Sequence, residues 1–207
     1  MTGSTVIEEC LEVITNYYEG GKGLKGKSLK NYTSGDHGQE GLETIVDNII
    51  RKVAAHCGVS SDRLKVNDHY FYPPNWQEED PQRMDHHVWV DNQVRLIVES
   101  RACVDKPFYT LKRAVVRNMM QLDYVQEHCA ADLKFAFVGF AIDIKQRLIN
   151  TLDQTMGHGE RIENFKLSPY RRGYQKKNWF DHGVHEEGVK AFVRYLMEIF
   201  EPLGVKK

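Results

Sequence analysis

The chain has 207 residues, hydrophobic side chains make up 41% of it, and the formal net charge is −1. This length and apolar content favour a single domain over residues 1–207 with a real core, and the near-neutral charge excludes a chain that holds a polyanion by bulk charge alone. No stretch has the apolar length of a membrane span, and the first ten residues lack the basic and apolar regions of a signal peptide, so we expect a cytoplasmic protein with no membrane partner.

Two amphipathic helices are predicted in the first part of the chain. Apolar residues at three-four spacing predict a helix over 5–18, and glycines follow it. A lysine-rich, glycine-bearing loop (20–32) comes next. Asp36 and Gln39 resemble a capping box, which starts a second helix that Gly58 ends. Glu40, Glu43 and Asp47 lie off the apolar stripe of this second helix, so their carboxylates are expected outside the core.

A sheet is predicted in the middle of the chain. A short strand within 63–74 precedes an acidic loop, and two strands at 86–90 and 93–101 form a hairpin around Asp91-Asn92. Pro107 can start a helix over about 107–126. The apolar run 132–142 reads as a strand buried on both faces, and a strand–helix–strand order implies a right-handed crossover to a parallel neighbour.

The last part of the chain is expected to be helical at both ends and irregular between them. Residues 143–155 favour a helix, the basic and glycine-bearing stretch 156–183 favours a loop, and an apolar stripe predicts a final helix that Pro202 ends. Residues 166–180 hold five basic side chains, four aromatic ones and no acid, which suits a surface that meets phosphate.

The hairpin predicts a metal site. Because it turns at 91–92, Asp85, which precedes the first strand, and Glu99, near the end of the second, should become neighbours. The period of two puts Glu99 and Arg101 on one face of the sheet. Two hard oxygen ligands suit Mg²⁺, and a nearby cation suits a phosphate. One corner of the sheet would then hold the parts needed to hydrolyse a phosphodiester.

This order of elements, together with Asp85…Glu99-Ser100-Arg101, resembles the PD-(D/E)XK nuclease superfamily, and within it the type II restriction endonucleases. The resemblance implies an α/β fold with a restriction-endonuclease-like αβββαβ core, a mixed sheet flanked by helices. That core would span about 39–142. The N-terminal helix and lysine-rich loop (1–38) would precede it, and a C-terminal helical and DNA-recognition region (143–207) would follow it.

Carried over to this chain, the family pattern makes Asp85 and Glu99 the ligands of Mg²⁺, with Glu43 as a third acid from the preceding helix and Glu40 as the second choice for it. Met84 stands where the family has proline. Arg101 stands in the place of the family's lysine. Arginine stays protonated and cannot act as a base, but it can clamp a phosphate oxygen. Lys106 or Lys112 could instead supply an amine.

The resemblance also implies a DNA substrate and a homodimer, because two-fold symmetric proteins usually read palindromic sites. The expected activity is Mg²⁺-dependent cleavage of double-stranded DNA at a short, palindromic sequence. Arginine can read guanine edges, asparagine and glutamine can read adenine, and lysine can grip phosphates. The candidate DNA-binding residues are Lys27, Lys106, Arg171, Arg172, Gln175, Lys176, Lys177 and Asn178.

Other interpretations stay open at this point. The chain could be a structure-specific repair or recombination nuclease of the same fold, or a DNA-binding protein without catalysis. His87 shares the side of Asp85 and could reach the site, whereas His86 should face the other way. Residues 181–187 hold two histidines and three acids and form a rival zinc site, without the H-E-x-x-H order. The four cysteines are irregularly spaced with no C-x-x-C pair, which favours buried thiols.

Overall fold

The computed structural model describes residues 3–21, 39–71, 82–102, 133–140, 162–168 and 183–204. The expected helices at 107–126 and 143–155, the lysine-rich loop and residues 169–182 of the basic stretch lie outside these residues. Within them the chain is mixed α/β. Its elements are α1 (Gly3–Gly21), α3 (Gln39–His56), β1 (Leu64–Phe71), β2 (Gln82–Val90), β3 (Gln93–Ala102), β4 (Lys134–Phe140), β5 (Ile162–Ser168), α6 (Glu186–Phe200) and the short 3₁₀ turn η2 (Glu201–Leu203).

The five strands form one mixed sheet in the order β1-β2-β3-β4-β5. The first three strands pair antiparallel, whereas β4 runs parallel to β3 and β5 runs parallel to β4. The predicted hairpin and the predicted parallel crossover strand are therefore confirmed. The alternation of Phe165 and Leu167 with polar neighbours also makes a strand of residues 162–168, where we expected a loop. The loop prediction for 156–183 is wrong in this segment.

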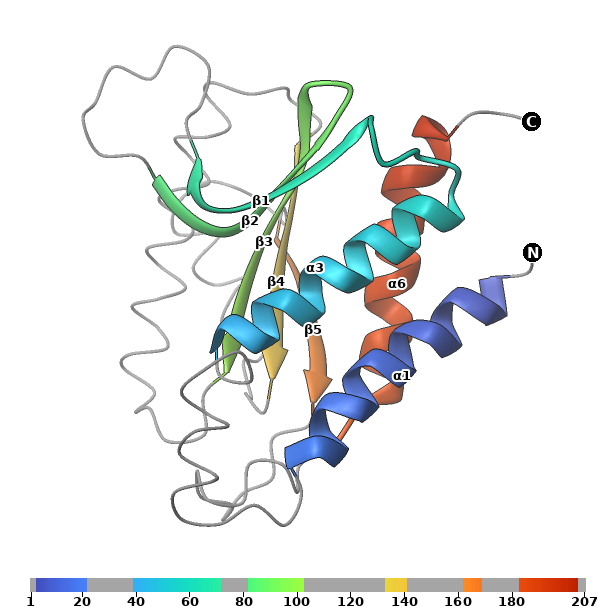
Figure 1. The fold of residues 1–207 in the computed structure, drawn as a ribbon, viewed down its shortest axis with the longest axis vertical. Helices are drawn as coiled ribbons and strands as arrows, with labels where there is room; N and C mark the ends of the chain where they lie inside the picture. Colours follow the sequence, from blue (N-terminus) through green and yellow to red (C-terminus); the bar gives the residue numbers. More distant parts are fainter. Residues whose placement is uncertain are drawn as a thin grey trace.

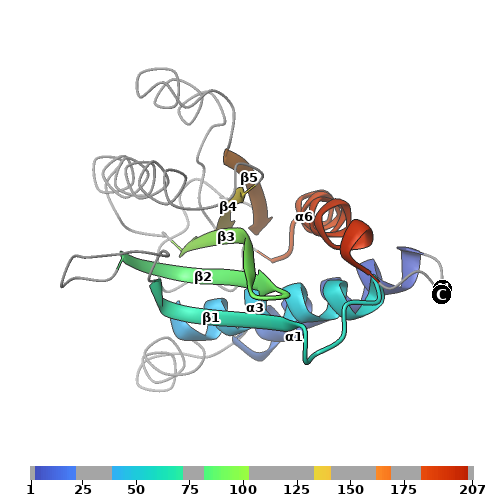
Figure 2. The same cartoon turned by 90° about the horizontal axis from the view of Figure 1, so that it is seen from above.

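Helices α1, α3 and α6 lie together on one face of the sheet (Figures 1 and 2). Their apolar stripes match the predicted ones and are buried against each other and the sheet. The buried stripe residues of the three helices are Val6, Cys10, Ile14, Tyr17 and Tyr18; Leu42, Ile45, Val46, Ile49 and Val53; and Val189, Phe192, Val193, Leu196 and Phe200. Val88, Leu96 and Val98 belong to the same core cluster, so alternate residues of β2 and β3 point to the helices.

The hairpin turn has the conformation that its sequence predicts. Asp91 and Asn92 have φ of +53° and +60°, as a type I′ turn requires, and asparagine and aspartate tolerate this region better than most residues. Arg63 donates two hydrogen bonds to the Asp91 carboxylate, at 2.8 and 2.6 Å, and these hold the pKa of Asp91 below its ordinary value. The turn pairs Val90 with Gln93, and a bulge between Val88 and Trp89 then shifts the register by one residue, which brings Asp85 towards Glu99. No helix of the described residues is long and apolar enough to cross a membrane.

Candidate active site

The site forms where β2 and β3 separate. Their paired register runs from the turn to His86 and Val98. Beyond this pair the first half of β2 curves away with β1, whereas β3 continues beside β4 (Figure 1). Asp85 is the fourth residue of β2, and not a residue before the strand as we expected. It therefore stands in the opening of the fork, opposite the last residues of β3.

Where β2 and β3 no longer pair through their backbones, the Asp85 carboxylate links the two strands by hydrogen bonds. Its Oδ2 accepts a hydrogen bond from the Ser100 backbone N–H at 2.8 Å and one from the Ser100 hydroxyl at 3.2 Å. In return, the Asp85 backbone N–H donates to Oε1 of Glu99 at 3.3 Å. The predicted meeting of Asp85 and Glu99 is thus confirmed, and backbone and hydroxyl donors orient both carboxylates.

Both acids are buried, with Asp85 8% and Glu99 1% exposed. Because Val98 packs in the core with the helices, strand alternation places Glu99 on the opposite face of the sheet. Ile97 and Phe137 share that face and are also buried, at 0% and 1% exposed. Two carboxylates in such surroundings are costly, and a cation between them offsets the cost. The donor set therefore fits a divalent cation.

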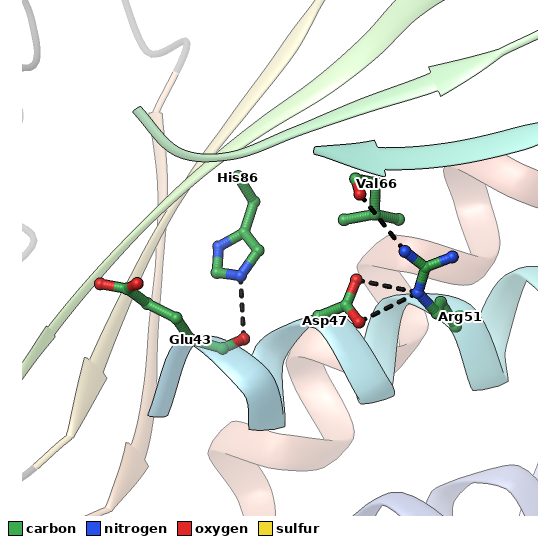
Figure 3. Close-up of polar contacts among 5 residues, drawn as sticks. All are labelled: Glu43, Asp47, Arg51, Val66 and His86. Atoms are coloured by element: carbon green, nitrogen blue, oxygen red, sulfur yellow. Dashed lines mark hydrogen bonds and ion pairs between the residues drawn. The ribbon is translucent and has the colours of Figure 1, made fainter. Parts of the chain in front are cut away.

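His86 ties the site to helix α3 (Figure 3). Its Nε2 lies 2.9 Å from the backbone carbonyl oxygen of Glu43, and since a carbonyl only accepts, this nitrogen carries the hydrogen. One turn further along the helix, Asp47 binds Arg51, which also donates to the Val66 carbonyl of β1 at 3.3 Å. In Figure 3 the Glu43 side chain extends away from Asp47 and Arg51. These contacts fix α3 against β1 and β2.

His87 points to the other face, as predicted for a neighbour in a strand, and is 3% exposed. Its Nδ1 accepts a hydrogen bond from the indole Nε1–H of Trp89 at 2.8 Å. The two rings meet edge-to-face with their centroids 6.2 Å apart. His87 is paired with Ile97, so it is the diagonal neighbour of Glu99 across the hairpin.

The parallel strands extend this face of the sheet towards β5. Glu99, Phe137 and Asn164 are in register across β3, β4 and β5, and the next row on the same face is Arg101, Gly139 and Lys166. Two strand spacings separate Arg101 from Lys166, which is about 10 Å between their backbones. Lys166 is thus a second basic residue at this end of the sheet. Sequence reasoning missed it as a site residue because β5 was expected to be a loop.

Several predicted site residues lie outside the described part of the chain. They are Lys27, Lys106, Lys112, Arg171, Arg172, Gln175, Lys176, Lys177 and Asn178, and their DNA-binding roles stay predictions. Glu40 and Arg101 lie in α3 and β3, and their roles also stay predictions. Within the described residues no group of three or more His, Cys, Asp or Glu side chains is arranged to hold a metal ion. The ligand role of Glu43 therefore stays a prediction beside the Asp85–Glu99 pair.

In the rival zinc segment, the described residues have an ordinary structural use. The Nδ1 of His185 accepts a hydrogen bond from the Gly188 backbone N–H at 2.9 Å and caps the start of α6. Glu186 and Glu187 stand in the first turn of the helix, where the helix dipole favours acids. Asp181 and His182 lie outside the described residues.

Ser100 is a candidate site residue to which the sequence analysis gave no role. Its role comes from the fork, because its backbone N–H and hydroxyl face the carboxylate that enters between the strands. The side-chain period alone places Ser100 on the face opposite Glu99 and gives no sign of this contact. The contact between Ser100 and Asp85 depends on the curvature of β2, which the sequence does not indicate.

No protein-family model matches this chain, and a search of curated proteins finds no similar sequence.

Proposed function

We propose that the protein is a metal-dependent deoxyribonuclease with a restriction-endonuclease-like core, and that it cleaves double-stranded DNA at a short, palindromic sequence as a homodimer. The observation that carries the proposal is the pair of buried carboxylates in the fork, where Ser100 orients the carboxylate of Asp85 and the backbone N–H of Asp85 orients that of Glu99. A hydrogen-bonded carboxylate pair on one face, with basic residues in the next row, is an arrangement suited to phosphodiester hydrolysis.

Asp85 and Glu99 would hold Mg²⁺, an ion that usually binds through one or two carboxylates and completes its shell with water and phosphate oxygens. When bound, the ion supplies Lewis-acid activation and lowers the pKa of a bound water. Ser100 keeps the Asp85 carboxylate in position. Arg101 stays protonated at neutral pH and would bind a phosphate oxygen rather than accept a proton.

The charge of the helix-covered face of the sheet indicates from which side DNA would approach. The exposed face of α1 carries Glu8, Glu9, Glu12 and Glu19. Acids on a surface repel the phosphate backbone, so a duplex would meet the molecule on the face of the sheet away from α1. That is the face on which Glu99 lies.

The test is digestion of plasmid and phage DNA with and without Mg²⁺, followed by sequencing of the ends. We expect discrete fragments with one common terminal sequence. Asp85→Asn and Glu99→Gln should each abolish cleavage, while Lys134→Ala, on the other face of the sheet, should cut like the wild type. Random products in wild-type digests would favour a structure-specific nuclease. No Mg²⁺-dependent cleavage on any DNA would overturn the proposal and favour a non-catalytic DNA-binding protein.

A further inference from the structure

The inference concerns the pair of aromatic rings that follows Asp85 on β2. Asp85, His87 and Trp89 occupy alternate positions of the strand, and Trp89 donates its indole N–H to Nδ1 of His87 at 2.8 Å. The edge-to-face angle of 73° between the rings suits this contact. The indole nitrogen is a donor only, so Nδ1 of His87 has to be the acceptor.

This contact decides where the hydrogen of the imidazole resides. A neutral ring carries one hydrogen, and with Nδ1 accepting, that hydrogen is on Nε2. The other tautomer and the doubly protonated ring would both set an N–H of His87 against the N–H of Trp89. A ring that binds a metal through Nε2 would need its hydrogen on Nδ1, which the indole also excludes.

We propose that Trp89 locks His87 in the neutral Nε2–H tautomer, so that His87 is a fixed hydrogen-bond donor beside the Asp85–Glu99 pair and neither a metal ligand nor a base. Its target, which rests on the proposed function, is a phosphate oxygen of the bound phosphodiester. The pairing of His87 with Ile97 makes Glu99 its diagonal neighbour, and such neighbours are about 7–8 Å apart, within reach of an aromatic side chain. A phosphodiester bound to the ion that Asp85 and Glu99 would hold would therefore lie near this donor.

The tautomer can be read directly in the protein without metal or DNA. Long-range ¹H–¹⁵N correlation spectra of histidine-labelled protein separate the two ring nitrogens, and the His87→Gln spectrum assigns the signals. We expect the wild type to carry the hydrogen on Nε2 before and after saturation with Mg²⁺. We expect Trp89→Phe to show a mixture of tautomers. A hydrogen on Nδ1 in the wild type, or its loss from Nε2 on addition of Mg²⁺, would overturn the lock.

The two amide variants test the donor. Glutamine places its amide nitrogen near the position of Nε2, whereas asparagine places it near Nδ1. We expect His87→Asn to lower the single-turnover cleavage rate at least about tenfold, as the loss of a hydrogen bond to a charged group implies. His87→Gln should recover most of this loss, and both variants should bind Mg²⁺ with the wild-type affinity in calorimetry.

The outcomes separate this inference from the proposed function. If the wild-type chain cuts no DNA but carries the hydrogen on Nε2, the proposed function and the phosphate target fall and the lock stands. If both amide variants lose the same activity and also bind Mg²⁺ more weakly, His87 is a metal ligand and the inference is wrong. If neither variant loses activity, His87 and Trp89 only pack together, which also overturns the donor role.

Discussion

Asp85→Ala should destabilise the fold much more than Asp85→Asn, although both variants remove the same charge. The alanine variant deletes the acceptor of two hydrogen bonds and leaves the buried N–H of Ser100 without the oxygen that lies 2.8 Å from it. The asparagine variant keeps an oxygen at this position. Since both variants relieve repulsion from Glu99 equally, the difference between them leaves out the charge and measures the lost hydrogen bonds together with the small cavity that alanine leaves.

A buried donor left without a partner costs about 1–3 kcal/mol, and a hydrogen bond that helps to orient the site adds about 1 kcal/mol. We therefore expect a difference of about 2–4 kcal/mol in the free energy of unfolding, or roughly 5–15 °C in Tm for a chain of this size. Urea and thermal unfolding without metal, followed by circular dichroism, measure it. Equal stability of the two variants would refute the inference that Asp85 closes the fork, whatever the proteins do to DNA.

Three further predictions test other parts of the structure. Gly188→Ala should destabilise the fold by about 1–3 kcal/mol in urea unfolding, because a Cβ there would lie 1.8 Å from the Lys166 carbonyl oxygen. The control Gly183→Ala has nothing within 4 Å of its Cβ and should cost less, despite the φ of +71° at this position. The reverse order of stabilities would contradict the packing of α6 on β5. Burial raises the pKa of Cys10 from 9.0 to about 12, so between these pH values the folded state holds a proton that the unfolded state has lost. The free energy of unfolding should therefore fall as the pH rises above about 9. In denaturation curves from pH 8 to 11, the free energy of unfolding of Cys10→Ala should fall less steeply than that of the wild type. Lys166→Ala should lower the slope of log K for DNA binding against log salt concentration by about 0.9, measured with Ca²⁺ in place of Mg²⁺. Lys134→Ala should leave this slope unchanged. Equal slopes for the two variants would remove Lys166 from the interface.

Sequence patterns predicted the elements whose character is local. The apolar stripes of α1, α3 and α6 follow from three-four spacing, and most of the residues expected in them are buried. The Asp91-Asn92 turn could be predicted, and it brings the start of β2 beside the end of β3, but a bulge between Val88 and Trp89, which no sequence pattern indicated, sets the register that places Asp85 against Glu99. The stripes and the turn depend on neighbours along the chain or across one turn, which a sequence displays directly.

Features that depend on the curvature of the sheet could not be predicted in this way. The fork between β2 and β3 gives Ser100 its contact with Asp85, and nothing in the local alternation indicates it. The strand β5 was hidden because its alternation is short and lies within a basic, glycine-bearing stretch, so its pairing with β4 was needed to recognise it. The row of Arg101 and Lys166 follows from this pairing and was missed with it.

The fork has a consequence for interpreting natural variation in relatives of this chain. Its two branches are joined by a carboxylate oxygen that accepts from Ser100, and an amide oxygen can do the same. A homologue that has lost its chemistry can therefore carry asparagine at position 85 and keep its sheet intact, while alanine there would be selected against even in a silent copy. Under the proposed function, the choice between Asp and Asn at this position would report on chemistry, whereas the choice between either of them and an apolar residue reports on folding. An alignment of homologues would therefore show selection on chemistry and selection on folding as different substitutions at position 85.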